Sequence, residues 1–408
     1  CSSKNFKRNF DMLVKPRVRG FMCVTSHPDG CCKHVEEQVN YIKSQPKIDM
    51  PRRVLVIGSS TGYGLAARIS AAFGGKASTL GVIFEKPGTS SKTASAGWYN
   101  TAAFHDHAEK SDLYAKTING DAFSDEVKSK VIEIIKKDLK EIDLLIYSVA
   151  APRKKDPETG DIITSVLKPI GKNISMLGLN TDKECIQKVE LEPASKSEID
   201  DTIKVMGGDD WSRWIQQLHK AGALANNFKT TAFTYIGDKI TWDLYWDGTI
   251  GAAKKDLDRK VKSIRQQIKD INGDARVSVL KAVVTQSSSA IPVMPLYLSI
   301  LFKEMKSRGT HEDCIQQLYR LLTTRLFSDG ENYDIEGRYR VDDFELDRQV
   351  QKSVSDAWSN ISDESLALLA DFDEYKRSFL RLFGFEIAGI DYSRDVDPEK
   401  VIPGIINL

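Results

Sequence analysis

A tyrosine and a lysine in the segment TYIGDKITWDLYWDGTIGAAK, residues 234–254, have side chains that could perform acid catalysis. Tyr245 and Lys254 are separated by eight residues, so on one continuous helix they would lie on opposite faces. They converge only if Tyr245 precedes the helix and Gly248 and Gly251 turn the chain back. An ammonium beside a phenol lowers its pKa from the usual value of about 10, so we predict Tyr245 as an acid. A purely structural role for both residues is the alternative.

A Gly-rich turn follows the short apolar segment 53–57 and precedes a predicted helix over residues 65–73. Glycines in this context let the backbone approach a pyrophosphate, whose charge is stabilised by the helix N-terminus. The GxxxGxG spacing is typical of short-chain dehydrogenases and reductases. A tight turn without a ligand is the alternative. We predict that the turn binds a dinucleotide through Gly58, Ser59, Ser60, Thr61, Gly62 and Tyr63.

Further candidate cofactor residues lie where other predicted strands end, because ligands of a parallel sheet bind at the carboxyl ends of its strands. Glu85 follows the strand 79–84 and could accept hydrogen bonds from ribose hydroxyls while repelling a 2′-phosphate, which favours NADH over NADPH. A surface glutamate is the alternative. Asp121 could contact adenine or cap the helix predicted at 125–139. The remaining candidates are Phe84, Ala122, Val149, Ala150, Val283, Val284 and Thr285.

The alternation of strands and helices predicts an α/β fold with a doubly wound, mostly parallel sheet. We predict strands at 53–57, 79–84, 113–118, 142–148, 229–235 and 275–285. We expect helices at 65–73, 125–139, 212–221, from Lys254 onward, and at 292–306, 312–326, 344–360 and 365–382. A short hairpin around Gly20 precedes this core, and the polar segment 155–195 is expected to be an excursion over the sheet. We expect Asp209 and Asp210 to serve the start of the next helix.

Residues 12–408 are predicted to form a single Rossmann-type domain. Its parts would be a cofactor half (52–153), a catalytic and substrate half (154–330) and a C-terminal helical part (331–408). Residues 1–11 begin with Cys rather than Met, and could be the remnant of a transit peptide, of a longer precursor or of cloning.

The composition excludes several classes of protein. Apolar residues make up 41% and charged residues 28% of the 408 residues, as in soluble globular proteins. A formal net charge of +1 argues against general nucleic-acid binding, and no apolar run is long enough to span a membrane. The six cysteines are typical of reduced thiols in an intracellular protein. His105 and His107 form an HxH pair that we expect to be exposed, so no metal site is predicted.

An ordered set of motifs resembles the NADH-dependent trans-2-enoyl-CoA and enoyl-acyl-carrier-protein reductases over about residues 12–391. These motifs are VKPRVRG, HPDGC, GSSTGYGLAARI, AGWYNTAAF, NGDAFSDE, IYSVAAPRKKDPETG, LKPIGK, KVMGGDDW, YIG with LYWDGTIGAAK, VVTQSSSAIPVMPLYLSILFK and RVDDFELDRQVQ. Two conservative departures are Asp209, where many members have Glu, and Val149, where many have Leu.

The resemblance implies an enlarged short-chain dehydrogenase/reductase fold, usually monomeric, that reduces the C2–C3 double bond of enoyl thioesters with NADH in fatty-acid synthesis. Tyr245 and Lys254 match the family's catalytic pair, and Tyr235 matches a second tyrosine expected to orient the thioester, although the two tyrosine roles could be exchanged. Partners would be enoyl-CoA or enoyl-acyl-carrier protein. The expected location is the cytoplasm, or the mitochondrial matrix if residues 1–11 are a transit remnant. Alternatives are a short-chain reductase acting on a ketone or aldehyde and a non-catalytic nucleotide-binding protein.

Overall fold

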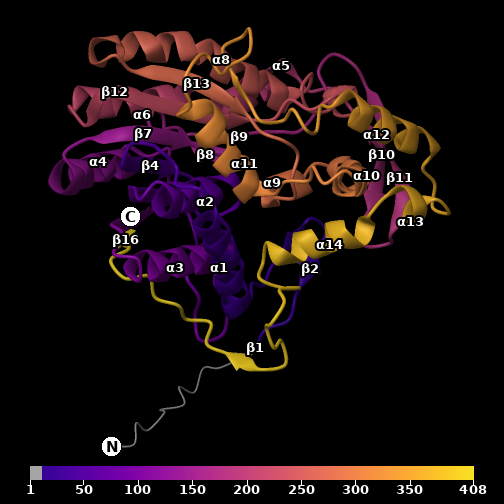
Figure 1. Cartoon of the computed structure of the whole chain (residues 1–408). Helices are drawn as coiled ribbons and strands as arrows, with labels where there is room; N and C mark the ends of the chain where they lie inside the picture. The colour runs from indigo at the N-terminus through magenta and orange to yellow at the C-terminus, as the bar shows by residue number, and fades with distance from the viewer. Residues whose placement is uncertain (1–11) are drawn as a thin grey trace, which may run out of the picture.

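The computed structural model describes residues 12–408, so the predicted leader, residues 1–11, lies outside the described residues. An eight-stranded sheet with the order β14-β13-β12-β7-β4-β5-β6-β16 forms its centre (Figure 1). All its neighbouring strands are parallel. The strands are β4 (Arg53–Ile57), β5 (Ser78–Ile83), β6 (Ala115–Asn119), β7 (Ile142–Tyr147), β12 (Leu224–Thr234), β13 (Asp274–Val279), β14 (Tyr339–Arg340) and β16 (Ile406–Asn407). This confirms the predicted doubly wound α/β fold.

Helices cover both faces of the sheet because the central strands are apolar on both sides. On one face Val54 and Val56 of β4 pack against α1 (Pro28–Ser44), α2 (Gly62–Ile69), α3 (Ala96–Glu109) and α11 (Cys314–Leu321). On the other face Leu55 and Ile57 pack against α4 (Asp125–Ile134), α6 (Asp209–Lys220) and α8 (Thr249–Gln267), and α5 (Lys196–Met206) contacts α8. Three of these helices continue into short π-helical turns, at 70–74, 135–139 and 322–326.

A third hydrophobic cluster lies beyond the carboxyl ends of the strands and draws most of its residues from the second half of the chain, with others from the N-terminal segment and α3. It contains α10 (Met294–Ser307), α12 (Arg348–Asn360), α13 (Leu366–Leu369) and α14 (Phe372–Arg381), which gather at the right of Figure 1. The predicted helix over 292–306 is therefore a core element, with Leu296, Tyr297 and Leu298 fully buried. The helix predicted over 365–382 is wrong as one piece, because Asp371 caps a new helix by accepting from the Glu374 amide at 3.1 Å.

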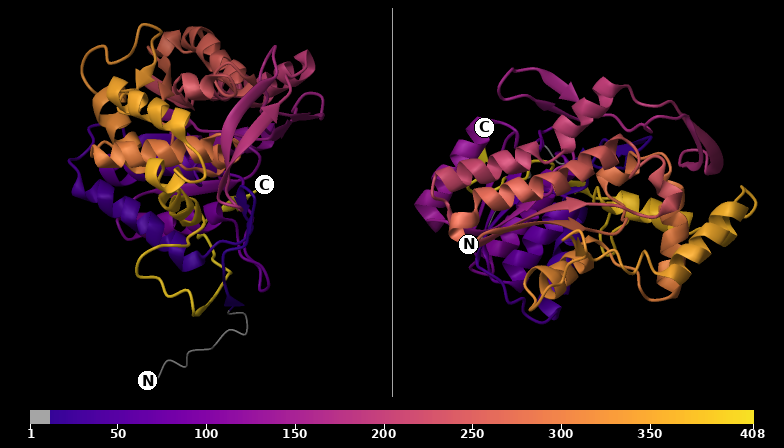
Figure 2. Two further views of the ribbon diagram at one scale, coloured as in Figure 1. Left: turned by 90° about the vertical axis from the view of Figure 1, so that its right-hand side faces the viewer. Right: turned by 90° about the horizontal axis from the view of Figure 1, so that it is seen from above.

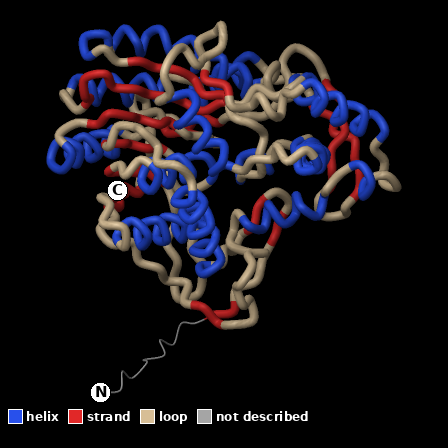
Figure 3. The backbone as a smooth tube through the Cα atoms, in the orientation of Figure 1, coloured by secondary structure: helices blue, strands red, loops and turns tan. Residues whose placement is uncertain are grey.

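Short antiparallel pairs surround this body. The predicted N-terminal hairpin is confirmed as β2 (Val18–Arg19) and β3 (Met22–Cys23), with Gly20 at a positive φ of 57°. β1 (Met12–Leu13) pairs with β15 (Asp395–Val396). The segment 155–195, predicted as an excursion over the sheet, takes part in two hairpins, which project in Figure 2 and are red in Figure 3. They are β8 (Arg153–Lys155) with β9 (Ile162–Thr164), and β10 (Ile174–Asn180) with β11 (Cys185–Leu191).

A buried ion pair connects two helices on one face of the sheet. Asp210 accepts a hydrogen bond from the Lys128 ammonium at 2.8 Å and another from the Tyr147 hydroxyl at 2.9 Å. The Lys128 side chain is fully buried and also donates to the Ala122 carbonyl at 2.7 Å. Asp209 and Asp210 lie in the first turn of α6 as predicted, but neither side chain caps the helix, and the Asp210 carboxylate balances a charge on α4.

The Asp210→Ala variant should lose about 3–5 kcal/mol of unfolding free energy, because it leaves the Lys128 ammonium buried without a counterion. Urea unfolding would measure this as a lower midpoint with an unchanged slope. Glu133→Ala is the matched control, since it removes an exposed partner of Lys130 on the same helix and should cost at most about 1 kcal/mol. Equal losses in the two variants would contradict the assignment of a buried ion pair.

Candidate active site

The Gly-rich turn is closed by backbone contacts that leave no room for side chains at two glycines. Gly58 has a φ of 80°, and a Cβ there would lie 2.0 Å from the Ser148 carbonyl oxygen. A Cβ on Gly64 would lie 1.9 Å from the Gly58 carbonyl oxygen. Thr61 precedes the first turn of α2, and within residues 12–408 its side chain makes no capping hydrogen bond. The amides of Gly58 and Ser59 donate to the Val82 carbonyl at 2.9 and 3.1 Å, so the N–H groups left for the predicted pyrophosphate are those at the start of α2.

Glu85 lies directly beside the Gly-rich turn. Its Oε1 accepts a hydrogen bond from the Ser60 hydroxyl at 2.6 Å, and burial raises the pKa of the carboxyl group. A Cβ on Gly97 would lie 2.0 Å from the same oxygen, so α3 approaches closely here. Phe84, the preceding residue, exposes 78% of its surface and presents a free aromatic face. This placement suits a carboxylate that accepts hydrogen bonds from ribose hydroxyls.

The next two predicted segments follow β6 and β7. Asp121 accepts from the Phe123 amide at 2.9 Å, whereas Ser124 caps α4 by accepting from the Val127 amide at 3.2 Å. The capping alternative for Asp121 is therefore wrong, because Ser124 occupies that position. Ala122 is partly buried, and after β7 Val149 is partly buried and Ala150 exposed.

The residues Val283, Val284 and Thr285 also reach the Gly-rich turn, although β13 ends at Val279, earlier than predicted. A Cβ on Gly62 would lie 3.4 Å from the Thr285 methyl carbon. The Tyr63 hydroxyl donates to the Lys281 carbonyl at 2.7 Å. A cavity of about 220 Å³ between the two segments is lined in part by Thr61, Gly62, Val283 and Val284. The fold thus brings these two predicted cofactor segments together.

Tyr245 lies before the helix that carries Lys254, as the sequence requires for the two to converge. The chain leaves β12, forms the short helix α7 (Lys239–Trp242), and turns at Gly248 into α8. The Tyr245 carbonyl accepts from the amides of Gly248 at 3.2 Å and Gly251 at 2.9 Å. A Cβ on Gly251 would lie 1.9 Å from the Trp246 carbonyl oxygen. The predicted reversal at the two glycines is therefore confirmed.

Burial dominates the proton affinities of this pair. Lys254 donates to the Phe233 carbonyl at 3.1 Å, and burial lowers the pKa of its ammonium to about 8. Burial also raises the pKa of the Tyr245 phenol. The predicted lowering of the Tyr245 pKa is therefore wrong for the chain alone, because desolvation of the phenolate is the effect that acts on this group. Tyr245 is held as a neutral phenol at pH 7.

Tyr235 follows the last residue of β12, and its ring meets that of Tyr245 edge to face with centroids 5.1 Å apart. Its hydroxyl donates to Oε1 of the buried Glu345 at 3.0 Å. Within residues 12–408 the Tyr245 hydroxyl forms no hydrogen bond. Sequence reasoning gave Glu345 no role although it lies in the motif RVDDFELDRQVQ, because nothing local indicates a partner 110 positions away.

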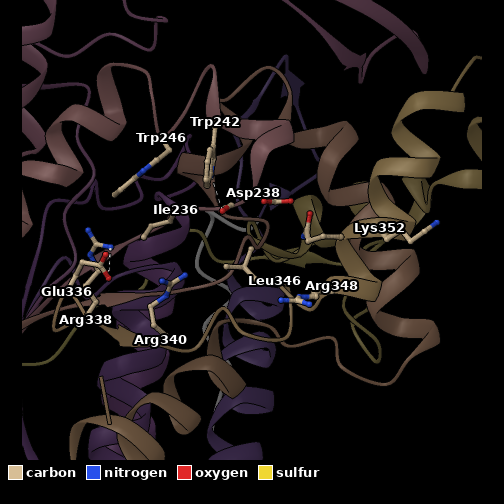
Figure 4. Close-up of a pocket in the computed structure, with 12 residues that line it drawn as sticks. Ile236, Asp238, Trp242, Trp246, Glu336, Arg338, Arg340, Leu346, Arg348 and Lys352 are labelled. Atoms are coloured by element: carbon tan, nitrogen blue, oxygen red, sulfur yellow. Dashed lines mark hydrogen bonds and ion pairs between the residues drawn. The ribbon is translucent and has the colours of Figure 1, made fainter. Parts of the chain in front are cut away.

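A second cavity, of about 610 Å³, lies next to this tyrosine pair (Figure 4). Ile236, which follows Tyr235, forms part of its wall together with Gln351. Figure 4 shows Trp242 and Trp246 on one side of the cavity and basic side chains on the other. Arg340 there is already paired with Asp342 at 2.7 Å.

The HxH pair lies on α3, away from these cavities. The expectation that it is exposed is wrong for His105, which is buried and lies 2.7 Å from the Thr117 hydroxyl. None of the helices formed by residues 12–408 combines the length and apolar character needed to span a bilayer.

The sheet, the Gly-rich turn and the tyrosine–lysine pair together define a dinucleotide-dependent reductase of the Rossmann type. Family models match almost the whole described chain: the NAD(P)H binding domain of trans-2-enoyl-CoA reductase at 13–90, its catalytic region at 92–327, and an enoyl reductase FAD binding domain at 333–396. The chain belongs to the trans-2-enoyl-CoA reductase family. This confirms the predicted family.

Individual relatives agree with this assignment. An enoyl-[acyl-carrier-protein] reductase [NADH] of Paraburkholderia phytofirmans is 57% identical over 97% of this chain and 100% of its own. The Burkholderia multivorans protein of the same name is 59% identical over 97% of this chain and 99% of its own. Crystal structures of trans-2-enoyl-CoA reductases from Clostridium acetobutulicum with NADH and Treponema denticola with NAD have TM-scores of 0.92 and 0.91. They are 42% and 44% identical, covering 95% and 96% of this chain and 98% and 100% of their own.

The residues of the third family segment do not fit a flavin dinucleotide. Within 333–396, all of which is described, none of Gly337, Gly384 and Gly389 follows a strand and opens a helix. The segment therefore has no strand–turn–helix cradle for a pyrophosphate. Its buried acceptor, Glu345, is occupied by phenol groups. No step of the chemistry is therefore assigned to a flavin.

The Gly58→Ala variant should bind NADH at least about tenfold more weakly and unfold at a lower denaturant concentration, because its Cβ would collide with the Ser148 carbonyl. Gly160→Ala is the matched control: Gly160 has the same φ of 80°, but a Cβ there lies 4.0 Å from its nearest neighbour. NADH fluorescence titration and urea unfolding would measure both variants. Equal effects would mean that backbone strain, not close approach, explains the glycine.

Proposed function

We propose that the chain reduces the C2–C3 double bond of trans-2-enoyl thioesters with NADH. The observation that carries this proposal is Tyr245, a buried phenol without a hydrogen-bond partner among residues 12–408, on the reversed segment that leads to Lys254. The relatives' names and the NADH-bound neighbours bear out the predicted reaction class and cofactor. The ketone-reductase and non-catalytic alternatives have no comparable support.

Tyr245 would act on the oxygen of the thioester. Bound NADH supplies a hydride to C3, which leaves negative charge on this oxygen as an enolate. A hydrogen bond from Tyr245 would stabilise the charge as it develops, so binding energy is used in the transition state. The raised pKa keeps the phenol protonated until then, which makes Tyr245 the proton donor, directly or through water.

Lys254 would hold the cofactor end of the site. Its pKa of about 8 leaves the ammonium mostly protonated at pH 7, so it can donate to ribose hydroxyls as well as to the Phe233 carbonyl. Glu85 would accept from the other ribose of the dinucleotide, near Ser60. A 2′-phosphate at that position would meet a carboxylate, which supports NADH over NADPH.

We propose acyl-carrier protein as the carrier of the enoyl group, in fatty-acid synthesis. The support is that relatives at 57% and 59% identity are named for this carrier, whereas the CoA-named structures are 42% and 44% identical. Both carriers present the same thioester, so activity on enoyl-CoA is expected as well. The monomeric state and the cytoplasmic location, with the mitochondrial matrix as the alternative, stay predictions.

The reaction is tested by following NADH oxidation with crotonyl-acyl-carrier protein, crotonyl-CoA and acetoacetyl-CoA, each repeated with NADPH. We expect oxidation of NADH with both enoyl thioesters, a higher kcat/KM with the protein carrier, and little reaction with the ketone or with NADPH. Activity on acetoacetyl-CoA alone would make the chain a ketone reductase. NADH binding without turnover of any of the three would support the non-catalytic alternative.

Replacing Tyr245 with Phe should lower kcat by about 100-fold or more while leaving NADH affinity within about twofold, because only the transition-state hydrogen bond is lost. Tyr319→Phe is the control, since the Tyr319 hydroxyl donates to the Pro46 carbonyl and contacts neither Tyr235 nor Tyr245. Steady-state kinetics and NADH fluorescence would measure both variants. Normal turnover by the Tyr245→Phe variant would remove Tyr245 from the chemistry.

A further inference from the structure

The buried carboxylate of Glu345 contacts both Tyr235 and the backbone next to the predicted cofactor segment 283–285. It comes from the segment between β14 and α12 and is fully buried. Its Oε1 accepts from the hydroxyls of Tyr235 at 3.0 Å and Tyr297 at 2.7 Å. Its Oε2 accepts from the Ala282 amide at 2.6 Å. Ala282 directly precedes Val283, so one side chain joins a catalytic tyrosine to a cofactor segment.

The two oxygens are arranged for an ionised carboxylate. Every group that faces them is a donor: two phenols at Oε1 and one amide at Oε2. Burial raises the pKa of Glu345 and the Asp342 charge adds to this, while the Lys281 ammonium, the Ala282 amide and the Tyr297 hydroxyl oppose the shift. Lys281 is itself buried, and donates to the Ala282 carbonyl at 2.8 Å. Replacing Oε1 by a donor group would therefore leave both phenol hydroxyls without their hydrogen-bond acceptor.

The tyrosine hydroxyls differ in what they can offer a substrate. A phenol hydroxyl can donate one hydrogen bond, and Tyr235 donates its hydrogen bond to Glu345. Tyr235 can then present only lone pairs to a ligand. Tyr245, whose ring meets that of Tyr235 edge to face, forms no hydrogen bond through its hydroxyl within residues 12–408. Only Tyr245 of this pair can donate a proton to a thioester oxygen.

We propose that Glu345 is a positioning residue. It accepts a hydrogen bond from the Tyr235 hydroxyl, holds this ring against Tyr245, and thereby leaves Tyr245 as the acid. This inference rests on the proposed function, and it separates the roles of the two tyrosines. Gln351 supports the arrangement from α12, since its amide donates to the Glu345 carbonyl at 2.7 Å and to the Tyr297 hydroxyl at 3.2 Å. Gln351 also lines the cavity shown in Figure 4, so one side chain separates the network from that space.

The Glu345→Gln variant tests the role of the charge with little change of shape. With its carbonyl on the Ala282 amide, the carboxamide turns its NH₂ toward the phenols and forces both hydroxyl protons away. We expect kcat for crotonyl-CoA to fall by about tenfold, with the KM for NADH within about twofold, because Tyr245 loses its fixed neighbour while the cofactor site stays intact. Tyr297→Phe is the matched control: it removes the other phenol from the same oxygen and should leave kcat nearly unchanged.

A double-mutant cycle with Tyr235→Phe separates positioning from a general structural effect. If Glu345 acts through Tyr235, then Glu345→Gln should change kcat by less than about twofold in the Tyr235→Phe background. An equal tenfold fall in both backgrounds would overturn the proposal, as would a wild-type kcat in Glu345→Gln. If Glu345→Gln does not fold, Glu345→Asp can replace it. This variant keeps the carboxylate but moves it away from Tyr235 by the length of one methylene, and its effect on kcat should depend on Tyr235 in the same way.

Urea unfolding of the same four proteins provides a readout that does not need activity. A direct Glu345–Tyr235 bond makes the stability losses of the two single variants non-additive in the double variant. Additive losses of unfolding free energy would contradict a direct Glu345–Tyr235 hydrogen bond. If the wild-type protein turned over neither enoyl thioester, the proposed function would be refuted. The unfolding cycle would still decide whether Glu345 holds Tyr235.

Discussion

The close backbone packing at the Gly-rich turn is the constraint on which the rest of the site depends. No side chain fits at Gly58 or Gly64, so β4, the end of β7 and the start of α2 meet through main-chain atoms alone. Gly62 then lies against Thr285, which brings the loop after β13 to the same place. A cradle built from backbone presents N–H groups at fixed positions, and no side-chain ordering is needed when an anionic ligand binds.

Burial, more than pairing of charges, sets the chemistry of the reacting groups. Tyr245 and Lys254 are both nearly inaccessible, and burial raises the pKa of the first while lowering that of the second. The sequence-based expectation of an acidic phenol overlooked this, because spacing reveals which groups converge and not how dry their surroundings are. The outcome still suits catalysis: a neutral phenol in a low-dielectric site binds a developing enolate more strongly than it binds the uncharged thioester.

Local patterns made the core and most site segments predictable. Apolar runs such as 53–57 and 142–148 identify central strands, and in a parallel sheet their ends must share one edge, so Glu85, Val149 and Tyr235 could be placed from the sequence. The two-residue strands β14 and β16 are too short to carry a period. α5 was missed although Ser195 and Glu198 form a capping box, which is a local signal. The buried contacts of Asp210 and Glu345 could not be predicted, because their partners lie 82 and 110 residues away.

Two adjacent phenols have the same chemistry, so the chain itself must make them different. A Rossmann core supplies both tyrosines, one just after β12 and one in the turn before α8, yet nothing in their spacing decides which one donates. The asymmetry comes from residues 331–408, here called the C-terminal extension. Its buried Glu345 accepts a hydrogen bond from Tyr235 but not from Tyr245. The Tyr245 hydroxyl is not among the buried unpaired groups of residues 12–408, so it is open to solvent or to a ligand. The extension is therefore part of the active site, and not only a cover over the sheet.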